Sequence, residues 1–114
     1  MPPTLGDRLI HIIEAIDTIR SIIAGKSSED ISNHLYLRLA LERLLEIICE
    51  ASRHVPSDIK AGETNIDWQR IIDLGNLLRH AYHRVDVSLL MTIAQADLPP
   101  LKAFVERVLQ DERS

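Results

Sequence analysis

The spacing of aliphatic residues constrains the fold of this chain more than any other feature. Over long stretches with little glycine or proline, leucine and isoleucine recur at intervals of three and four, which places one apolar stripe on one face of a helix. The first such series consists of Leu5, Leu9, Ile12, Ile13, Ile16, Ile19 and Ile23. Thr4 can cap the start of this helix, and Gly25 its end. Since no segment alternates apolar and polar residues as a half-buried strand would, the sequence predicts an all-α protein.

Several more helices are expected after the first one. In chain order they lie at about 31–53 with room for a break near Asn33, from Trp68 to about His83, at 86–94, and after Asp97. Asp67, Asp86 and Asp97 are suited to cap the last three. The segment 55–65 predicts a loop with at most one short turn of helix. Together these elements predict a four-helix bundle with one or two extra short helices, forming a single domain over residues 1–114.

The composition predicts an aliphatic core, because 46% of the residues are hydrophobic and only 4% are aromatic. In the second helix we expect an inward-facing series that consists of Leu35, Leu39, Leu41, Leu44, Leu45, Ile48 and Ala51. Leu77 is expected inside in the third helix. The segment 27–30 is expected to form a polar turn, and the tail 110–114 to fray.

Charge and cysteine content limit the classes of function. The formal net charge of −4 argues against a general nucleic-acid coat protein, although a local basic patch could still bind RNA. The single cysteine, Cys49, excludes an intramolecular disulfide and is expected to be a buried small hydrophobe. No signal peptide and no apolar run of about 20 residues is present. We therefore expect a soluble, cytoplasmic protein that binds neither membrane nor DNA.

Groups capable of chemistry gather in the segment 76–86, at the end of the third predicted helix. Asn76 and His80 are four residues apart and share a helical face. Arg79 precedes the histidine, and Tyr82 follows it by two residues. An imidazole that titrates near neutral pH can take the proton of a ribose 2′-OH, and a neighbouring guanidinium can hold the phosphate. This pattern therefore indicates metal-independent cleavage of RNA, without a cofactor.

Two further residues of this segment could support such a site. His83 lies on the same stripe as Arg79, and Arg84 extends the stripe of His80 if the helix continues that far. His80, His83 and Asp86 also have a spacing that could hold a metal ion. Two histidines three residues apart are a weak signal without a third ligand, so we expect no metal.

Four pieces of the chain carry a resemblance to a known family. They are Leu41–Ala51, Ile66–Ile72, Asn76–Tyr82 and Asp97–Leu101. In their order and spacing they resemble the HepT-like HEPN family, the toxin half of HEPN–nucleotidyltransferase toxin–antitoxin pairs. The resemblance spans nearly the whole chain, and it implies a four-helix bundle of HEPN type.

The signature of that family is an arginine, usually followed by a polar residue, with a histidine a few positions on and a tyrosine two beyond. His80, Tyr82 and the polar Asn76 match this signature, but Gly75 stands where the arginine is usual. Either the site is degenerate or its guanidinium comes from Arg79, from Arg84 or from a second subunit. We favour Arg79, because the Arg-His-x-Tyr run is intact.

The resemblance implies a function and two partners. Such proteins are similar to metal-independent endoribonucleases that act as homodimers, and a small nucleotidyltransferase antitoxin neutralises them by transferring AMP to the motif tyrosine, here Tyr82. Our first hypothesis is a type VII toxin that cleaves cellular RNA such as tRNA or mRNA, with His80, Arg79 and Asn76 as its catalytic residues. The alternative is a catalytically degenerate protein that binds nucleotide or its nucleotidyltransferase partner. A helical scaffold without a site is the third reading.

Overall fold

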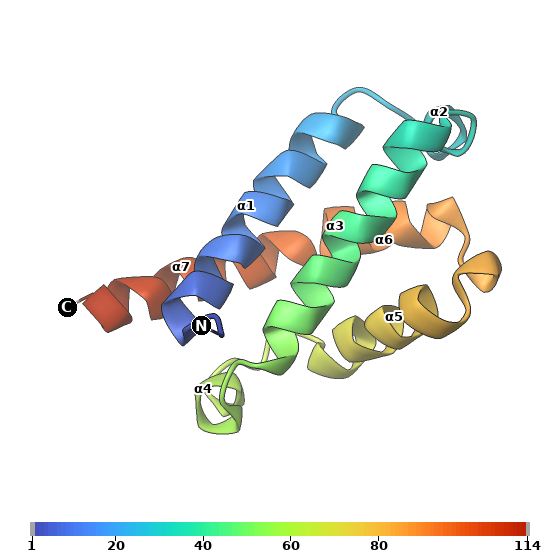
Figure 1. Ribbon diagram of the computed structural model, residues 1–114. Coiled ribbons are helices and arrows are strands. Elements are labelled where there is room, and N and C mark those ends of the chain that lie inside the picture. Colours follow the sequence, from blue (N-terminus) through green and yellow to red (C-terminus); the bar gives the residue numbers. More distant parts are fainter. Residues whose placement is uncertain (1, 114) are drawn as a thin grey trace.

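A computed structural model of the protein describes residues 2–113, and every element in that range is helical (Figure 1). The four long helices lie where the sequence predicts them, so the all-α expectation is confirmed. Between them lie three shorter α-helices and one 3-10 turn. The elements are α1 (Leu5–Ile23), α2 (Ser28–Ser32), α3 (Leu35–Arg53), α4 (Ser57–Ala61), α5 (Trp68–His80), η1 (Tyr82–Arg84), α6 (Val87–Ala96) and α7 (Leu98–Arg113).

Both ends of α1 follow from local chemistry. The Thr4 hydroxyl accepts a hydrogen bond from the backbone N–H of Asp7, and the Asp7 carboxylate accepts one from the N–H of Thr4, which closes a capping box. Gly25 follows the helix with a φ of 71°, a left-handed conformation that glycine adopts without steric cost. The predicted start and end of this helix are therefore confirmed.

The second predicted helix is two helices, separated near Asn33 as the sequence allows. Ser27 and Asp30, which we expected in a polar turn, instead form the capping box of the five-residue α2. The ring of His34 accepts a hydrogen bond from the N–H of Leu37 and so caps α3.

This break corrects the expected inner face of α3. Leu35 and Leu39 are 63% and 51% exposed, whereas Leu41, Leu45 and Ile48 are almost fully buried. Because a helix that begins anew after His34 sets its own phase, Leu37 rather than Leu35 packs against the core in its first turn.

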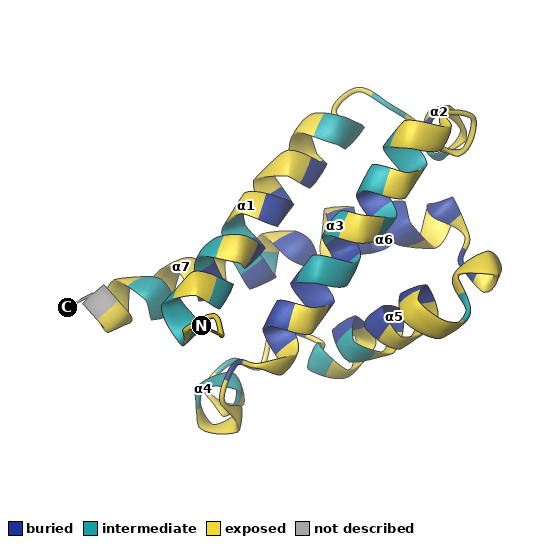
Figure 2. Cartoon of the chain, viewed as in Figure 1, coloured by how far each residue is buried: buried dark blue, intermediate teal, exposed yellow. Residues whose placement is uncertain are grey.

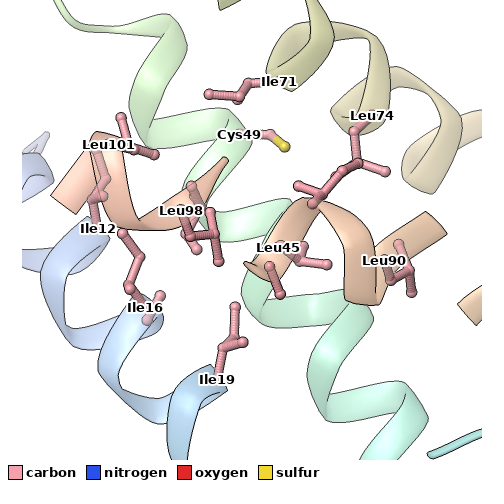
Figure 3. Close-up of a cluster of buried hydrophobic side chains, with 14 of the residues drawn as sticks. Ile12, Ile16, Ile19, Leu45, Cys49, Ile71, Leu74, Leu90, Leu98 and Leu101 are labelled. Atoms are coloured by element: carbon pink, nitrogen blue, oxygen red, sulfur yellow. The ribbon is translucent and has the colours of Figure 1, made fainter. Parts of the chain in front are cut away.

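The long helices pack around α3. Figure 1 shows α1 on one side of α3 and α5 on the other, with α7 and α6 behind them. α7 packs against α1 and α6, and α2 packs against α3 and α6. The core is aliphatic as expected, and Figure 3 shows part of it: Ile12, Ile16 and Ile19 from α1, Leu45 and Cys49 from α3, Ile71 and Leu74 from α5, Leu90 from α6, and Leu98 and Leu101 from α7. Figure 2 shows that each long helix keeps one buried and one exposed face.

The end of α5 differs from the prediction. The helix ends at His80 rather than near His83, because Ala81 leaves the helical region with φ −146° and ψ 41°. The chain then makes the 3-10 turn η1, so Arg84 does not extend the helical stripe of His80. Asp86 caps α6 as expected, its carboxylate accepting the N–H of Ser88 at 3.0 Å.

Ion pairs link α7, and the residue just before it, to other helices of the bundle. It begins at Leu98, directly after Asp97, and runs to Arg113, so residues 110–113, expected in a tail that frays, continue the helix, and residue 114 lies outside the described residues. The Asp97 carboxylate lies 3.0 Å from Nε of Arg70, and burial raises its pKa. Lys102 on α7 pairs with Asp17 on α1 at 2.7 Å. No helix among the described residues is both long and apolar enough to cross a membrane.

Candidate active site at the end of α5

Arg79 is held by two acceptors on different helices. Its Nη2 donates to Oδ1 of Asn76 at 2.8 Å, one turn earlier on α5. Its Nη1 donates to Oε2 of Glu50 on α3 at 3.1 Å. A guanidinium with two of its N–H groups engaged has a fixed plane, and its remaining donors can still reach a phosphate. The structure thus brings the predicted residues Asn76 and Arg79 together.

Glu50 is the centre of a small cluster of charged groups that the sequence analysis missed. Besides Arg79, its carboxylate lies 3.1 Å from Nε2 of His54 and 3.8 Å from Nη1 of Arg53. The hydrogen bond from His54, together with the nearby positive charges, lowers the pKa of the Glu50 carboxyl. Only the spacing within α3 could have indicated the pairs with Arg53 and His54. The pair with Arg79 joins residues 29 positions apart, for which the sequence carries no signal.

His80 lies exposed at the last residue of α5. Its ring makes no hydrogen bond or ion pair with the part of the chain that the structure describes, so it is open to a substrate. Successive helical residues point about 100° apart, and His80 therefore does not share the direction of Arg79 toward Glu50. The structure places the imidazole at the surface, where the predicted chemistry needs it, rather than in the core.

Tyr82 and the two supporting candidates lie just beyond the helix. The Tyr82 side chain is 62% exposed in η1, and its ring meets the His83 ring edge-on at 5.9 Å. His83 and Arg84 are exposed in the same turn. Between residues 2 and 113, no three His, Cys, Asp or Glu side chains form a group that could hold a metal ion.

Gly75, which stands in the position of the family's usual arginine, is buried against α3. A Cβ added there would lie 2.8 Å from Cβ of Cys49, closer than carbon atoms approach in folded proteins, and an ordinary 3.5 Å from its Sγ. A larger side chain therefore requires the two helices to move apart. Burial raises the pKa of the Cys49 thiol to about 12, which makes it a packing residue, as expected, rather than a nucleophile.

A shallow apolar hollow lies on the outer side of α5. It has a volume of about 400 Å³, and its apolar lining is provided by Leu74, Leu77, Leu89 and Ile93 of α5 and α6. Leu77 and Leu89 are 36% and 37% exposed, so the expectation that Leu77 is an inner residue is wrong. Asp67, Gln69, Arg70 and Asp73 complete the lining, and the exposed leucines of the hollow are suited to a protein contact.

Comparisons with known proteins identify the family of this chain. The family model described as "Ribonuclease HepT-like" matches residues 12–108. Over 100 residues the chain is 33% identical to "Putative RNase MJ1380" of Methanocaldococcus jannaschii, covering 88% of this chain and 92% of that protein. It is 35% identical over 102 residues to "Probable ribonuclease HepT" of Thermococcus cleftensis, covering 90% and 93%.

A third relative is a longer protein of Methanocaldococcus jannaschii, "Gamma-glutamylcyclotransferase and putative RNase MJ0434". The chain is 27% identical to it over 103 residues and spans 46% of its length. No solved structure matched the chain.

The helical bundle and the motif at the end of α5 define the class as a HEPN-type domain of the RNase-like kind. Within that class, the chain belongs to the HepT-like family.

Proposed function

We propose that the protein is a metal-independent endoribonuclease and the toxin of a HEPN–nucleotidyltransferase pair. The observation that carries this proposal is the fixed guanidinium of Arg79, which donates to Asn76 and Glu50 next to the exposed His80. Arg79 holds the scissile phosphate, Asn76 orients Arg79, and His80 is the acid–base group. Membership of a family described as ribonuclease supports the reaction class.

The reaction is a transesterification within the RNA strand. His80 takes the proton of the 2′-OH, O2′ bonds to the adjacent phosphorus, and the bond from phosphorus to O5′ breaks. The products are a 2′,3′-cyclic phosphate and a 5′-OH, whose oxygen receives a proton from an acid. Arg79 neutralises the negative charge that gathers on the phosphoryl oxygens in the transition state.

A homodimer supplies the second proton-transfer group. One imidazole acts as base while the His80 of a second copy donates the proton to O5′. The hollow with Leu77 and Leu89 lies on the helix that ends in His80, so contact through this surface brings the two α5 ends to one cleft. This arrangement also covers apolar surface that a monomer leaves in water.

The nucleotidyltransferase antitoxin acts on Tyr82 in this proposal. The tyrosyl oxygen bonds to the α-phosphorus of ATP, and pyrophosphate leaves. The 62% exposure of Tyr82 makes its ring accessible to such an enzyme. Each AMP adds a bulky, negatively charged group two residues from His80, where it repels the RNA backbone.

A growth assay tests the catalytic assignment. Expression of the wild type without antitoxin is expected to arrest growth, and His80→Ala and Arg79→Ala to relieve the arrest. Arg20→Ala is the matched control, because Arg20 is an exposed arginine on α1 far along the chain from the site. Purified wild-type dimer should cut cellular RNA in the presence of a metal chelator. Uncut RNA, or arrest that persists in His80→Ala, contradicts the proposal.

The contact between Gly75 and Cys49 favours one alternative, a degenerate HEPN protein. Because position 75 lies so close to Cys49, an arginine there would require α3 to shift. The guanidinium of the site must therefore come from Arg79 or Arg84. If wild type and Arg79→Ala bind nucleotide or the nucleotidyltransferase equally and neither cuts RNA, this alternative replaces the first proposal. If Arg84→Ala alone abolishes cleavage, the guanidinium is that of Arg84.

A further inference from the structure

A second groove, lined in part by Arg79, lies across the surface of α1 and α3. It has a volume of about 390 Å³. Its lining comes from three helices and consists of Arg8 and His11 from α1, Arg43, Glu46, Ile47, Glu50 and Ala51 from α3, and Arg79 from α5. In Figure 1 this is the side on which α1 and α3 run next to each other. Three arginines therefore meet at one groove in a chain whose net charge is −4.

The acidic residues of this groove are already paired. Glu46 accepts from Nη1 of Arg43 at 2.6 Å, and Glu50 accepts from Nη1 of Arg79 at 3.1 Å. The guanidinium of Arg8 has no hydrogen bond or ion pair with the described residues of the chain. The groove thus has three guanidinium groups and two carboxylates. The unpaired guanidinium, that of Arg8, lies at the α1 edge of the groove. An anion that enters gains a direct partner in Arg8 and a positive local field.

The groove continues as an apolar hollow along the seam between α1 and α3. A second depression of about 410 Å³ shares His11 and Ile47 with the first, and its lining is completed by the apolar Ala15 and Leu44 and by Glu14 and Thr18. A phosphate at the charged end and a flat apolar group farther along fit this succession of surfaces. Nucleotide units have this shape and polarity.

We propose that this groove binds the RNA strand next to its cleavage site, with a phosphodiester on Arg8 and Arg43 and a base over the seam at Leu44. The inference rests on the proposed function, because Arg79 lines the groove and also belongs to the catalytic site. A strand lying in the groove therefore leads directly to the scissile phosphate. This surface could not be predicted from local spacing, because its arginines come from three separate segments of the chain.

Binding to a strand that cannot be cut tests the groove. We would measure the fluorescence anisotropy of labelled single-stranded RNA with the His80→Ala protein at several salt concentrations. Adding Arg8→Gln should weaken binding about three- to tenfold and lower the salt slope by about 0.7, the value for one lost phosphate contact on a single strand. Arg20→Gln, which removes the same charge from α1 outside the groove, should leave both values unchanged.

A second variant, which is expected to raise the affinity for RNA, makes the test more decisive. Glu46→Gln removes a carboxylate from the groove and should tighten binding. Circular dichroism checks that each variant keeps its helices. The groove proposal is wrong if Arg8→Gln and Arg20→Gln bind RNA equally, or if Glu46→Gln weakens binding. An acidic peptide that binds in an Arg8-dependent way, with no RNA binding, would assign the groove to a protein partner and also overturn it.

The two proposals can fail separately. If the wild type never cuts RNA but Arg8→Gln loses binding, the ribonuclease proposal fails and the groove stands. If the wild type cuts RNA and Arg8→Gln cuts and binds equally well, the groove fails and the ribonuclease stands.

Discussion

Gly75 lies against Cys49 of α3, and its missing side chain is a packing feature. An alanine in the middle of a helix is usually more stable than a glycine by about 1 kcal/mol. At position 75 the added carbon meets Cβ of Cys49 at 2.8 Å, and a Cβ cannot rotate away as the end of a long side chain can. The local preference for alanine is therefore opposed by the contact between the two helices.

Gly75→Ala is expected to destabilise the protein by about 1–3 kcal/mol, the usual cost of overpacking a core. Urea unfolding followed by circular dichroism measures this change. Gly6→Ala is the matched control, because a Cβ there would have Thr4 Oγ1 at an ordinary 3.8 Å and nothing closer. This variant should be as stable as the wild type or more stable. In a Cys49→Gly background the cost of Gly75→Ala should shrink, and an unchanged cost would contradict the contact argument.

At the scale of the element, the helix ends follow from single polar side chains. Thr4, Ser27, Asp67 and Asp86 each accept a backbone N–H at the start of a helix. In α1 the hydrogen bonds to the backbone and hydroxyl of Thr4 lower the pKa of the Asp7 carboxyl. Because folding favours the ionised form, this contribution is present above the ordinary pKa of Asp7 and is lost as the pH falls through the lowered one.

Thr4→Ala should cost about 1 kcal/mol of stability at neutral pH, as the loss of an N-cap usually does. The same change should raise the pKa of Asp7 toward its ordinary 3.8, measured by NMR titration of the side-chain carboxyl. Thr18→Ala in the same helix is the control, since its hydroxyl only bonds back to the Glu14 carbonyl within α1. If both variants lose the same stability, the capping box does not set the start of α1.

At the scale of the whole molecule, the proposed dimer through the surface of α5 and α6 can be tested directly. Leu77→Glu places a charge in the apolar hollow and is expected to weaken the proposed dimer at least about tenfold, with loss of RNA cleavage. Analytical ultracentrifugation over a range of concentrations measures the association. Leu39→Glu is the control, because Leu39 is more exposed but lies on α3. A dimer that survives Leu77→Glu and dissociates with Leu39→Glu would move the interface to α3.

The positions of the long helices, several of their caps and the aliphatic character of the core could all be predicted from the sequence. These properties depend on residues within one or two turns of each other, such as Thr4 with Asp7, or on the three-and-four spacing along one face. The proximity of Asn76 and Arg79, one turn apart on α5, could be predicted for the same reason. The end of α5 could not, because nothing in the run through His83 marks Ala81 as the residue that leaves the helix.

Other features depend on the way helices meet. Glu50 and Arg79 pair across 29 positions, position 75 lies so close to Cys49 that a Cβ there requires a shift, and Leu35 is exposed whereas Leu37 packs against the core. Hydrogen bonds and apolar spacing act locally and can be read along one segment. Contacts between helices depend on their packing, which the whole set of buried side chains decides together.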